Sequence, residues 1–256
     1  MVSWKYLRKV ENMRASLLLT CTADLLYPAS ARACVEVLEA LGVEVNFPQL
    51  QTCCGQPWIN TGYQEGARRV ALHFLEVFER SDAVVALSSS CADTVRNHYA
   101  ELFPGSPALR ERLEALGRRT YEFCEFLHKV LGVDKFPPHP RPARTTYHSS
   151  CRTLRGIGLQ GVAEKYLAQM FGDDFVPLAE SENCCGFGGS FSIKLPEISG
   201  QLLAEKLKSI ETTGASQVAT LDLSCLTHLA AGAERLGLGQ IRFLHLGQII
   251  AEVMGR

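Results

Sequence analysis

The sequence predicts an α/β protein made of two tandem halves, each with a parallel sheet flanked by helices. Three observations support this fold class: short apolar runs alternate with helical periodicity, a proline-rich segment divides the chain, and cysteines recur at a nearly constant spacing. Strands that alternate with helices form parallel sheets, because each crossover helix returns the chain to the same end of the sheet. We therefore expect a first half at 13–132, a linker at 133–143 and a second half at 144–256.

The first half alternates between strand and helix patterns from end to end. Short runs that are apolar, or that alternate apolar and polar residues, indicate strands, and apolar residues at helical spacing indicate the crossovers. In order, the predicted elements are strand 16–20, helix 31–41, strand 43–47, helix 67–78, strand 83–87 and a last strand and helix within 119–132.

The second half repeats this order after a linker whose four prolines disfavour helix. Its predicted elements are strand 145–147, an extended run at 175–178, helix 198–210, strand 217–221 and a closing strand and helix within 241–255. The offsets between corresponding cysteines are 130 (Cys21 to Cys151), 131 (Cys53 to Cys184), 131 (Cys54 to Cys185) and 134 (Cys91 to Cys225). Four pairs at nearly one offset indicate an internal duplication, and hence two Rossmann-like halves.

Composition and charge exclude several classes of function. With 26 Lys plus Arg against 27 Asp plus Glu, the formal net charge is −1, and no basic run indicates a nucleic-acid partner. Residues 1–13 lack the apolar core of a signal peptide, and no apolar stretch of transmembrane length occurs. We expect a cytoplasmic protein, in which the ten cysteines are reduced thiols rather than disulfides.

The eight repeated cysteines follow the ends of predicted strands. Because the carboxyl ends of parallel strands meet at one edge of a sheet, four thiols in each half should converge there. The glycine after each vicinal pair allows a tight turn or a close backbone approach. Helices that begin after Cys91 and Cys225 are expected to lower the pKa of these thiols. Cys34 and Cys124 lack a repeated partner and are interpreted as buried apolar filler.

Four converging thiolates predict a metal site, either a structural zinc ion or an iron-sulfur cluster. Structural zinc usually takes ligands from short C-x2-C units, whereas the longer gaps here are 32 to 40 residues, which favours a multinuclear centre. Zinc stays the alternative. A metal-free thiol enzyme is a third hypothesis, and it predicts rapid alkylation of Cys54 or Cys185.

The repeated Cys...Cys-Cys-Gly...Cys pattern resembles the cysteine-rich CCG domains of the heterodisulfide reductases. Over residues 15–253 the chain more closely resembles the LutA (YkgE) family of lactate-utilisation proteins. This resemblance rests on Cys53-Cys54-Gly55-Gln56-Pro57 with Gly62-Tyr63, Ser88-Ser89-Ser90-Cys91, His148-Ser149-Ser150-Cys151-Arg152, Cys184-Cys185-Gly186-Phe187-Gly188-Gly189-Ser190-Phe191-Ser192, Pro196-Glu197-Ile198-Ser199 and Ser224-Cys225-Leu226. It implies an iron-sulfur electron-transfer subunit, with up to two clusters, that acts with LutB-like and LutC-like partners in oxidising L-lactate to pyruvate.

The chain departs from the heterodisulfide reductase pattern at two positions. There the last cysteine belongs to a C-x2-C unit, but here the corresponding residues are Ser88 and Asp222. Each half therefore has four thiols rather than five, which suits a [4Fe-4S] cluster. An oxygen ligand from Ser88 or Asp222 is a weaker alternative.

Polar residues near the second cysteine set are candidates for contact with a carboxylate substrate or a partner, or for tuning the reduction potential of a cluster. They are His148, Arg152, Arg155 and Lys194. The glycine-rich segment 186–189 lacks the G-x-G-x-x-G spacing of a dinucleotide loop, and no P-loop or flavin fingerprint occurs. We expect an oxidoreductase subunit that is not catalytic on its own.

Overall fold

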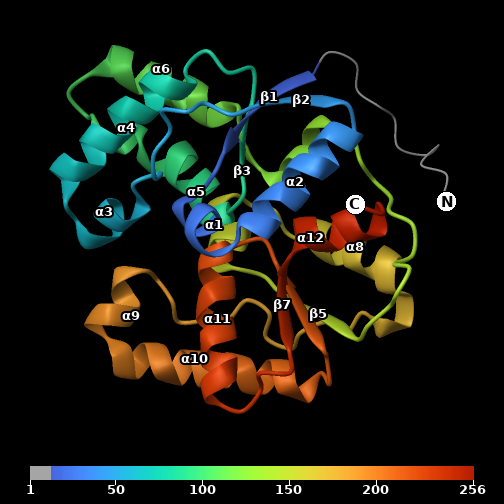
Figure 1. Cartoon of the computed structure of the whole chain (residues 1–256). Helices are drawn as coiled ribbons and strands as arrows, with labels where there is room; N and C mark the ends of the chain where they lie inside the picture. Colours follow the sequence, from blue (N-terminus) through green and yellow to red (C-terminus); the bar gives the residue numbers. More distant parts are fainter. Residues whose placement is uncertain (1–12) are drawn as a thin grey trace.

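A computed structural model describes residues 13–256 and forms two parallel sheets flanked by helices (Figure 1). Residues 1–12 lie outside the described residues. They make up most of segment 1–13, for which the sequence predicts no signal peptide. Within 13–256, no helix has the length and apolar character needed to cross a membrane. The predicted α/β class with two Rossmann-like halves is confirmed.

The first half contains a four-stranded sheet in the order β2-β1-β3-β4, in which every neighbouring pair is parallel. Its elements are β1 (Met13–Leu18), α1 (Cys21–Leu26), α2 (Pro28–Ala40), β2 (Val43–Asn46), α3 (Gln56–Thr61), α4 (Gln64–Phe78), β3 (Val84–Ala86), α5 (Ser89–Asp93), the π-helix η1 (Thr94–His98), the 3-10 helix η2 (Ala100–Leu102), α6 (Pro107–Arg118), β4 (Thr120–Glu122), α7 (Phe123–Glu125) and the π-helix η3 (Phe126–Val130).

The second half contains a three-stranded parallel sheet in the order β5-β6-β7. Its elements are β5 (Thr145–His148), the π-helix η4 (Arg152–Gly156), α8 (Val162–Phe171), the 3-10 helix η5 (Gly172–Asp174), α9 (Ser190–Lys194), α10 (Pro196–Thr212), β6 (Gln217–Thr220), α11 (Leu223–Arg235), β7 (Arg242–His245) and α12 (Leu246–Val253).

The extended run 175–178 occupies the place of β2 in the second half but forms only one bridge, from Phe175 to Thr145. The backbone N–H of Val176 donates to the Thr145 carbonyl at 2.8 Å. Pro177 has no N–H and therefore cannot extend a ladder of hydrogen bonds. The strand order is nevertheless the same in both halves, as a duplication requires.

The two halves share one hydrophobic core. Helix α12 of the second half lies beside α2 of the first (Figure 1), and the contact is so close that a Cβ added to Gly247 would lie 2.3 Å from the Cys34 sulfur. The buried residues of this core come from both sheets and include Leu18, Leu38 and Ile250. A second, smaller cluster lies wholly within the second half.

The proline-rich segment 133–143 is packed against the second half rather than being a bare connector. The Phe136 ring meets Tyr166 edge-on, with centroids 4.8 Å apart, and His139 stacks on Phe171 at 5.0 Å. The backbone N–H of His139 also donates to the Met170 carbonyl at 2.7 Å. The segment therefore holds α8 in place beside the shared core.

Candidate metal centres

The first cysteine set lies at the carboxyl-terminal edge of the four-stranded sheet. Cys21 begins α1, Cys53 and Cys54 lie in the loop after β2, and Cys91 lies in the first turn of α5. The Cys53 and Cys21 sulfurs are 3.7 Å apart, and the Cys54 and Cys91 sulfurs are 3.2 Å apart. Cys54 and Cys91 are buried, whereas Cys21 is exposed. The set therefore has an inner and an outer pair.

The second set repeats this arrangement. Cys151 lies directly before η4, Cys184 and Cys185 lie in the loop before α9, and Cys225 lies in the first turn of α11. The Cys185 and Cys225 sulfurs are buried and 3.3 Å apart, and Cys184 and Cys151 form the more exposed pair. All four line one pocket of about 390 Å³. The structure thus brings together the four cysteines predicted for each half.

The glycine after each vicinal pair is required by the backbone. Gly55 and Gly186 have positive φ angles of 75° and 88°. In both turns the glycine N–H donates to the first cysteine of the pair, at 3.5 Å to Cys53 and 3.3 Å to Cys184. A Cβ on Gly186 would lie 2.6 Å from the Ser199 carbonyl oxygen. The turn that presents the two sulfurs therefore needs a residue without a side chain.

The inner thiols do not have the lowered pKa expected from the adjacent helices. A hydrogen bond from Cys54 lowers the pKa of Cys91. Burial and the charge of the nearby Asp222 raise this pKa by more, so the pKa of Cys91 lies above its ordinary value. The same balance raises the pKa of Cys225, which accepts from Cys185. That prediction was wrong, because burial of a thiolate outweighs one helix terminus. A bound cation would restore the thiolate form.

Cys34 and Cys124 lie apart from both sets. Both are fully buried in the shared core, and the Cys34 sulfur lies 3.5 Å from Nδ1 of His245. Burial raises the pKa of both thiols well above the ordinary value. This is the behaviour expected of apolar filler.

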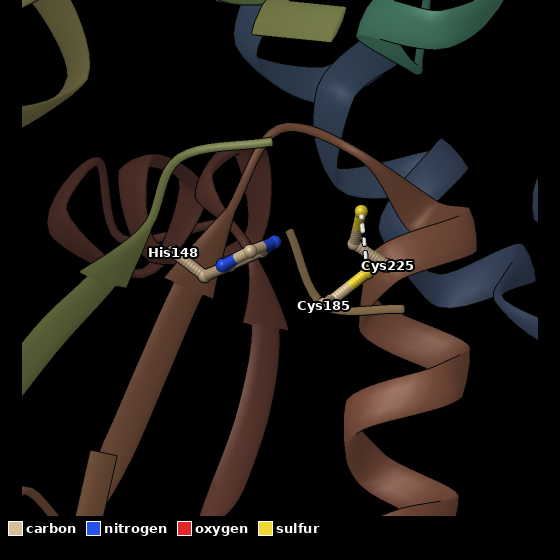
Figure 2. Close-up of side chains that lie close together, drawn as sticks. All are labelled: His148, Cys185 and Cys225. Carbon is tan, nitrogen blue, oxygen red and sulfur yellow. Dashed lines mark hydrogen bonds between the residues drawn. The ribbon is translucent and has the colours of Figure 1, made fainter. Parts of the chain in front are cut away.

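His148, the last residue of β5, is directed at the second cysteine set (Figure 2). A ring nitrogen of His148 and the sulfurs of Cys185 and Cys225 lie within 4.8 Å of one another. Burial lowers the pKa of His148 to about 3, so the imidazole is neutral at pH 7. The side chain is 0% exposed, which does not fit the predicted contact with a substrate or partner.

Arg152 joins the two halves instead of projecting freely into solvent. Its guanidinium forms an ion pair with the buried Asp93 and lies 3.1 Å from Nε2 of His98. Burial raises the pKa of Asp93, but hydrogen bonds from His98 and Asn97 and the charge of Arg152 outweigh burial and hold the pKa below its ordinary value. Arg152 also lines the 390 Å³ pocket beside the second set.

The other two predicted basic residues differ in their surroundings. Lys194, at the end of α9, lines the pocket beside the second set and its side chain is exposed. Arg155 points to a separate hollow that it shares with Asp93 and His98, and it donates to the Glu182 carbonyl at 3.0 Å. A small anion in the pocket would therefore meet Lys194 before Arg155.

Ser88 and Asp222, proposed as oxygen ligands, join the first turns of α5 and α11. The carboxylate of Asp222 accepts from the backbone N–H of Ser224 at 3.0 Å and from that of Ser90 at 2.8 Å. The Ser88 hydroxyl accepts from the Leu223 N–H at 3.3 Å. These contacts explain both residues without a metal, because each satisfies a helix N-terminus.

Sequence reasoning missed Lys206, a buried lysine of α10 near the second set. Its amine donates to the Glu180 carbonyl at 2.9 Å, and the residue is only 2% exposed. Burial lowers the pKa of Lys206, while the adjacent Cys185 and Cys184 raise it in part. A signal was present, because Lys206 falls on the buried apolar stripe of its helix beside Leu207.

Comparison with known proteins agrees with this geometry. The model of the CCG cysteine-rich domain matches residues 15–96 and 145–230. Lactate utilization protein A of Exiguobacterium sp. is 41% identical over 93% of this chain and 96% of the relative. Lactate utilization protein A 1 of Bacillus mycoides is 41% identical over 94% of this chain and 97% of the relative. The chain belongs to the lactate utilization protein A family.

A solved structure shows that this fold also occurs in a more distant sequence. A hypothetical protein from Helicobacter pylori superposes with a TM-score of 0.66 at 12% identity. The match covers 97% of this chain, which spans 50% of the Helicobacter pylori protein. At this identity the likeness concerns the fold alone.

The donors in each set fit a thiolate-bound metal. The sulfurs of three pairs, two in the first set and one in the second, lie 3.2 to 3.7 Å apart, close to the edge of about 3.8 Å that four sulfurs adopt around one tetrahedral ion with bonds of about 2.3 Å. The structure and the family therefore support metal binding by both cysteine sets.

Proposed function

We propose that the chain is an iron-sulfur electron-transfer subunit that acts in lactate utilisation in the cytoplasm. The observation that supports this most strongly is the convergence of four cysteines at each of two equivalent sheet edges within one chain. Relatives of nearly the same length bear the name lactate utilization protein A. Each set would hold one [4Fe-4S] cluster, so the chain would carry up to two.

The division of work between this chain and its partners follows from electron counting. Oxidation of L-lactate to pyruvate releases two electrons and two protons, and an iron-sulfur cluster, when bound, exchanges one electron at a time. Two equivalent cysteine sets in one chain suit the reception of two electrons. We expect LutB-like and LutC-like partners to complete the reaction, because no loop typical of a hydride cofactor was found in the sequence.

The surface beside the second set supports the docking of a partner. Trp58 of α3 and Ile193 of α9 belong to the two helices that supply Asn60 and Lys194 to the pocket lining, and they are 46% and 82% exposed. Large exposed apolar side chains that gather near a site are typical of an interface between proteins. Lys194 on the same rim would attract an acidic partner or the lactate carboxylate.

Structural zinc is the second candidate, and one observation favours it. The sulfur separations of 3.2 to 3.7 Å match a single tetrahedral ion more closely than a larger cluster. In that case each set would stabilise the loops around it, and the chain would act as a binding or assembly module.

Anaerobic purification followed by metal analysis separates the two candidates. An electron-transfer subunit should be brown, contain about four irons and four sulfides per occupied set, and give a paramagnetic signal in one redox state. A colourless, folded protein with stoichiometric zinc would overturn the redox function. Reconstitution with iron and sulfide under nitrogen guards against loss of clusters to oxygen, and zinc-loaded protein provides the control.

A further inference from the structure

We propose that His148 is a nitrogen ligand of the metal in the second centre, so that this centre has a mixed thiolate and imidazole shell. The inference rests on one part of the proposed function, namely that the second cysteine set binds metal, and its geometry is that of a single ion rather than a [4Fe-4S] cluster. It goes beyond that function because it makes the two centres chemically different. The inner donors of the second centre would be His148, Cys185 and Cys225, and one thiolate of the outer pair, Cys151 or Cys184, would complete a shell of four.

The distances suit direct coordination. A ring nitrogen of His148 lies within 4.8 Å of both sulfurs, which are themselves 3.3 Å apart. Figure 2 shows the imidazole extending from β5 toward the two cysteines. Bonds of about 2.0 Å to nitrogen and 2.3 Å to sulfur place these atoms about 3.5 Å apart around a tetrahedral ion. Side-chain movement of about 1 Å would therefore complete the contact.

The imidazole has an unmet need for a polar partner. Within residues 13–256 neither ring nitrogen of His148 has a hydrogen-bond partner, although the side chain is 0% exposed. His245 is equally buried, but its Nδ1 accepts from the Gly247 N–H at 3.1 Å, where it caps α12. Burying an imidazole without partners is costly, and a metal ion would satisfy one nitrogen. Neutral imidazole is a common ligand for such ions.

Only the second half contains this nitrogen. His148 ends β5 and pairs with Thr220, just as Leu18 ends β1 and pairs with Ala86. Leu18 is therefore the counterpart of His148, and it belongs to the apolar core. The first centre would consequently have thiolate ligands alone.

Lys206 adds a second polar difference near the same set. The alignment of α10 with α4 follows from the glycine contacts, because Leu202 lies against Gly186 as Val70 lies against Gly55. The offset between the two helices is therefore 202 − 70 = 132, so Lys206 in the second half corresponds in position to Phe74 in the first. The second half thus has a polar residue where the first half has an apolar one at two positions, His148 for Leu18 and Lys206 for Phe74. Both positions lie beside the second cysteine set, as expected if they belong to one binding site.

The test is spectroscopic and uses the full chain with its metal. Protein containing 15N-labelled histidine would be purified anaerobically, and its metal examined by pulsed electron paramagnetic resonance and X-ray absorption. The wild type should show a coupled histidine nitrogen or a nitrogen scatterer in the first shell. His148→Leu, which installs the first half's residue, and His148→Gln should both lose this signal. His245→Gln should keep it, and circular dichroism would confirm that each variant is folded.

The outcomes distinguish this inference from the function on which it rests. Wild-type protein that binds no metal would overturn the proposed function together with the inference. Metal-loaded wild type without a histidine nitrogen signal, or a signal that persists in His148→Leu, would overturn the inference alone.

Discussion

Replacing Gly186 with alanine should destabilise the chain and weaken the second centre. The φ angle of +88° is unfavourable for any residue with a Cβ, at about 1–2 kcal/mol. The new Cβ would also lie 2.6 Å from the Ser199 carbonyl oxygen, a backbone atom that cannot move without displacing α10. Overpacking of this kind costs about 1–3 kcal/mol. The expected total loss in the free energy of unfolding is about 2–5 kcal/mol.

Two matched variants separate the steric and conformational parts of this cost. Gly55→Ala has a similar φ of +75°, but its Cβ would meet the Val70 side chain at 2.9 Å, and that side chain can shift. Gly237→Ala has a φ of +77° and nothing within 4 Å, so only the cost of about 1–2 kcal/mol applies. The loss of stability should therefore be largest for Gly186→Ala, smaller for Gly55→Ala and smallest for Gly237→Ala.

Urea unfolding under nitrogen, with metal content measured on the same samples, tests this order. Gly186→Ala should lose metal as well as stability, while Gly237→Ala should keep its full metal content. If Gly186→Ala proved no less stable than Gly237→Ala and kept its metal, close backbone approach would not be the reason for glycine in this turn.

Three further predictions concern single ligands and charges. Cys185→Ser should abolish lactate-dependent reduction of the chain in a reconstituted complex, whereas Cys54→Ser should mainly lower stability or slow electron transfer onward from the chain. If, in single-turnover reduction, the Cys185 variant took up electrons normally and the Cys54 variant took up none, electrons would enter at the first centre. Lys206→Met should lower the midpoint potential of the second centre in a redox titration, because the buried positive charge of Lys206 favours the reduced form. Lys208 is exposed, so the control variant Lys208→Met should leave the midpoint potential unchanged. Asp93→Asn should cost about 1–3 kcal/mol at pH 7, because it removes a charged hydrogen bond to the partly exposed Arg152 between the halves. Because the native pKa of Asp93 is lowered, this contribution is complete above pH ~4 and is lost as pH falls through the native pKa, so acid unfolding of the variant should depend less on pH.

Much of the fold could be predicted because apolar periodicity is a local property of the chain. The runs at 43–47 and 83–87 form β2 and β3, and 241–255 forms β7 and α12. The π-helices could not be predicted, since five residues are too few to distinguish their period from that of an α-helix. The packing of α12 on α2 also could not, because it depends on contacts between residues more than 200 positions apart.

The candidate site divides in a similar way. Strand order brings the cysteines to the sheet edges, so spacing alone was enough to group them. The ligand role of the eight cysteines stays a prediction. The burial of His148 was not foreseen, because a polar residue at the end of a strand is usually exposed, and only the packing around the second set shows it. The burial of Lys206 was missed although its place on the apolar stripe of α10 indicated it.

The junction between α5 and α11 shows what duplication within one chain makes available. The Ser90 N–H donates to Asp222 and the Leu223 N–H donates to Ser88, so each helix start contacts the other, as the same patch would do in a symmetric dimer of single halves. Such a dimer would carry identical residues around both sites, and any mutation would alter the two together. With both copies in one chain the two sites can differ in sequence, as Leu18 beside one and His148 beside the other do.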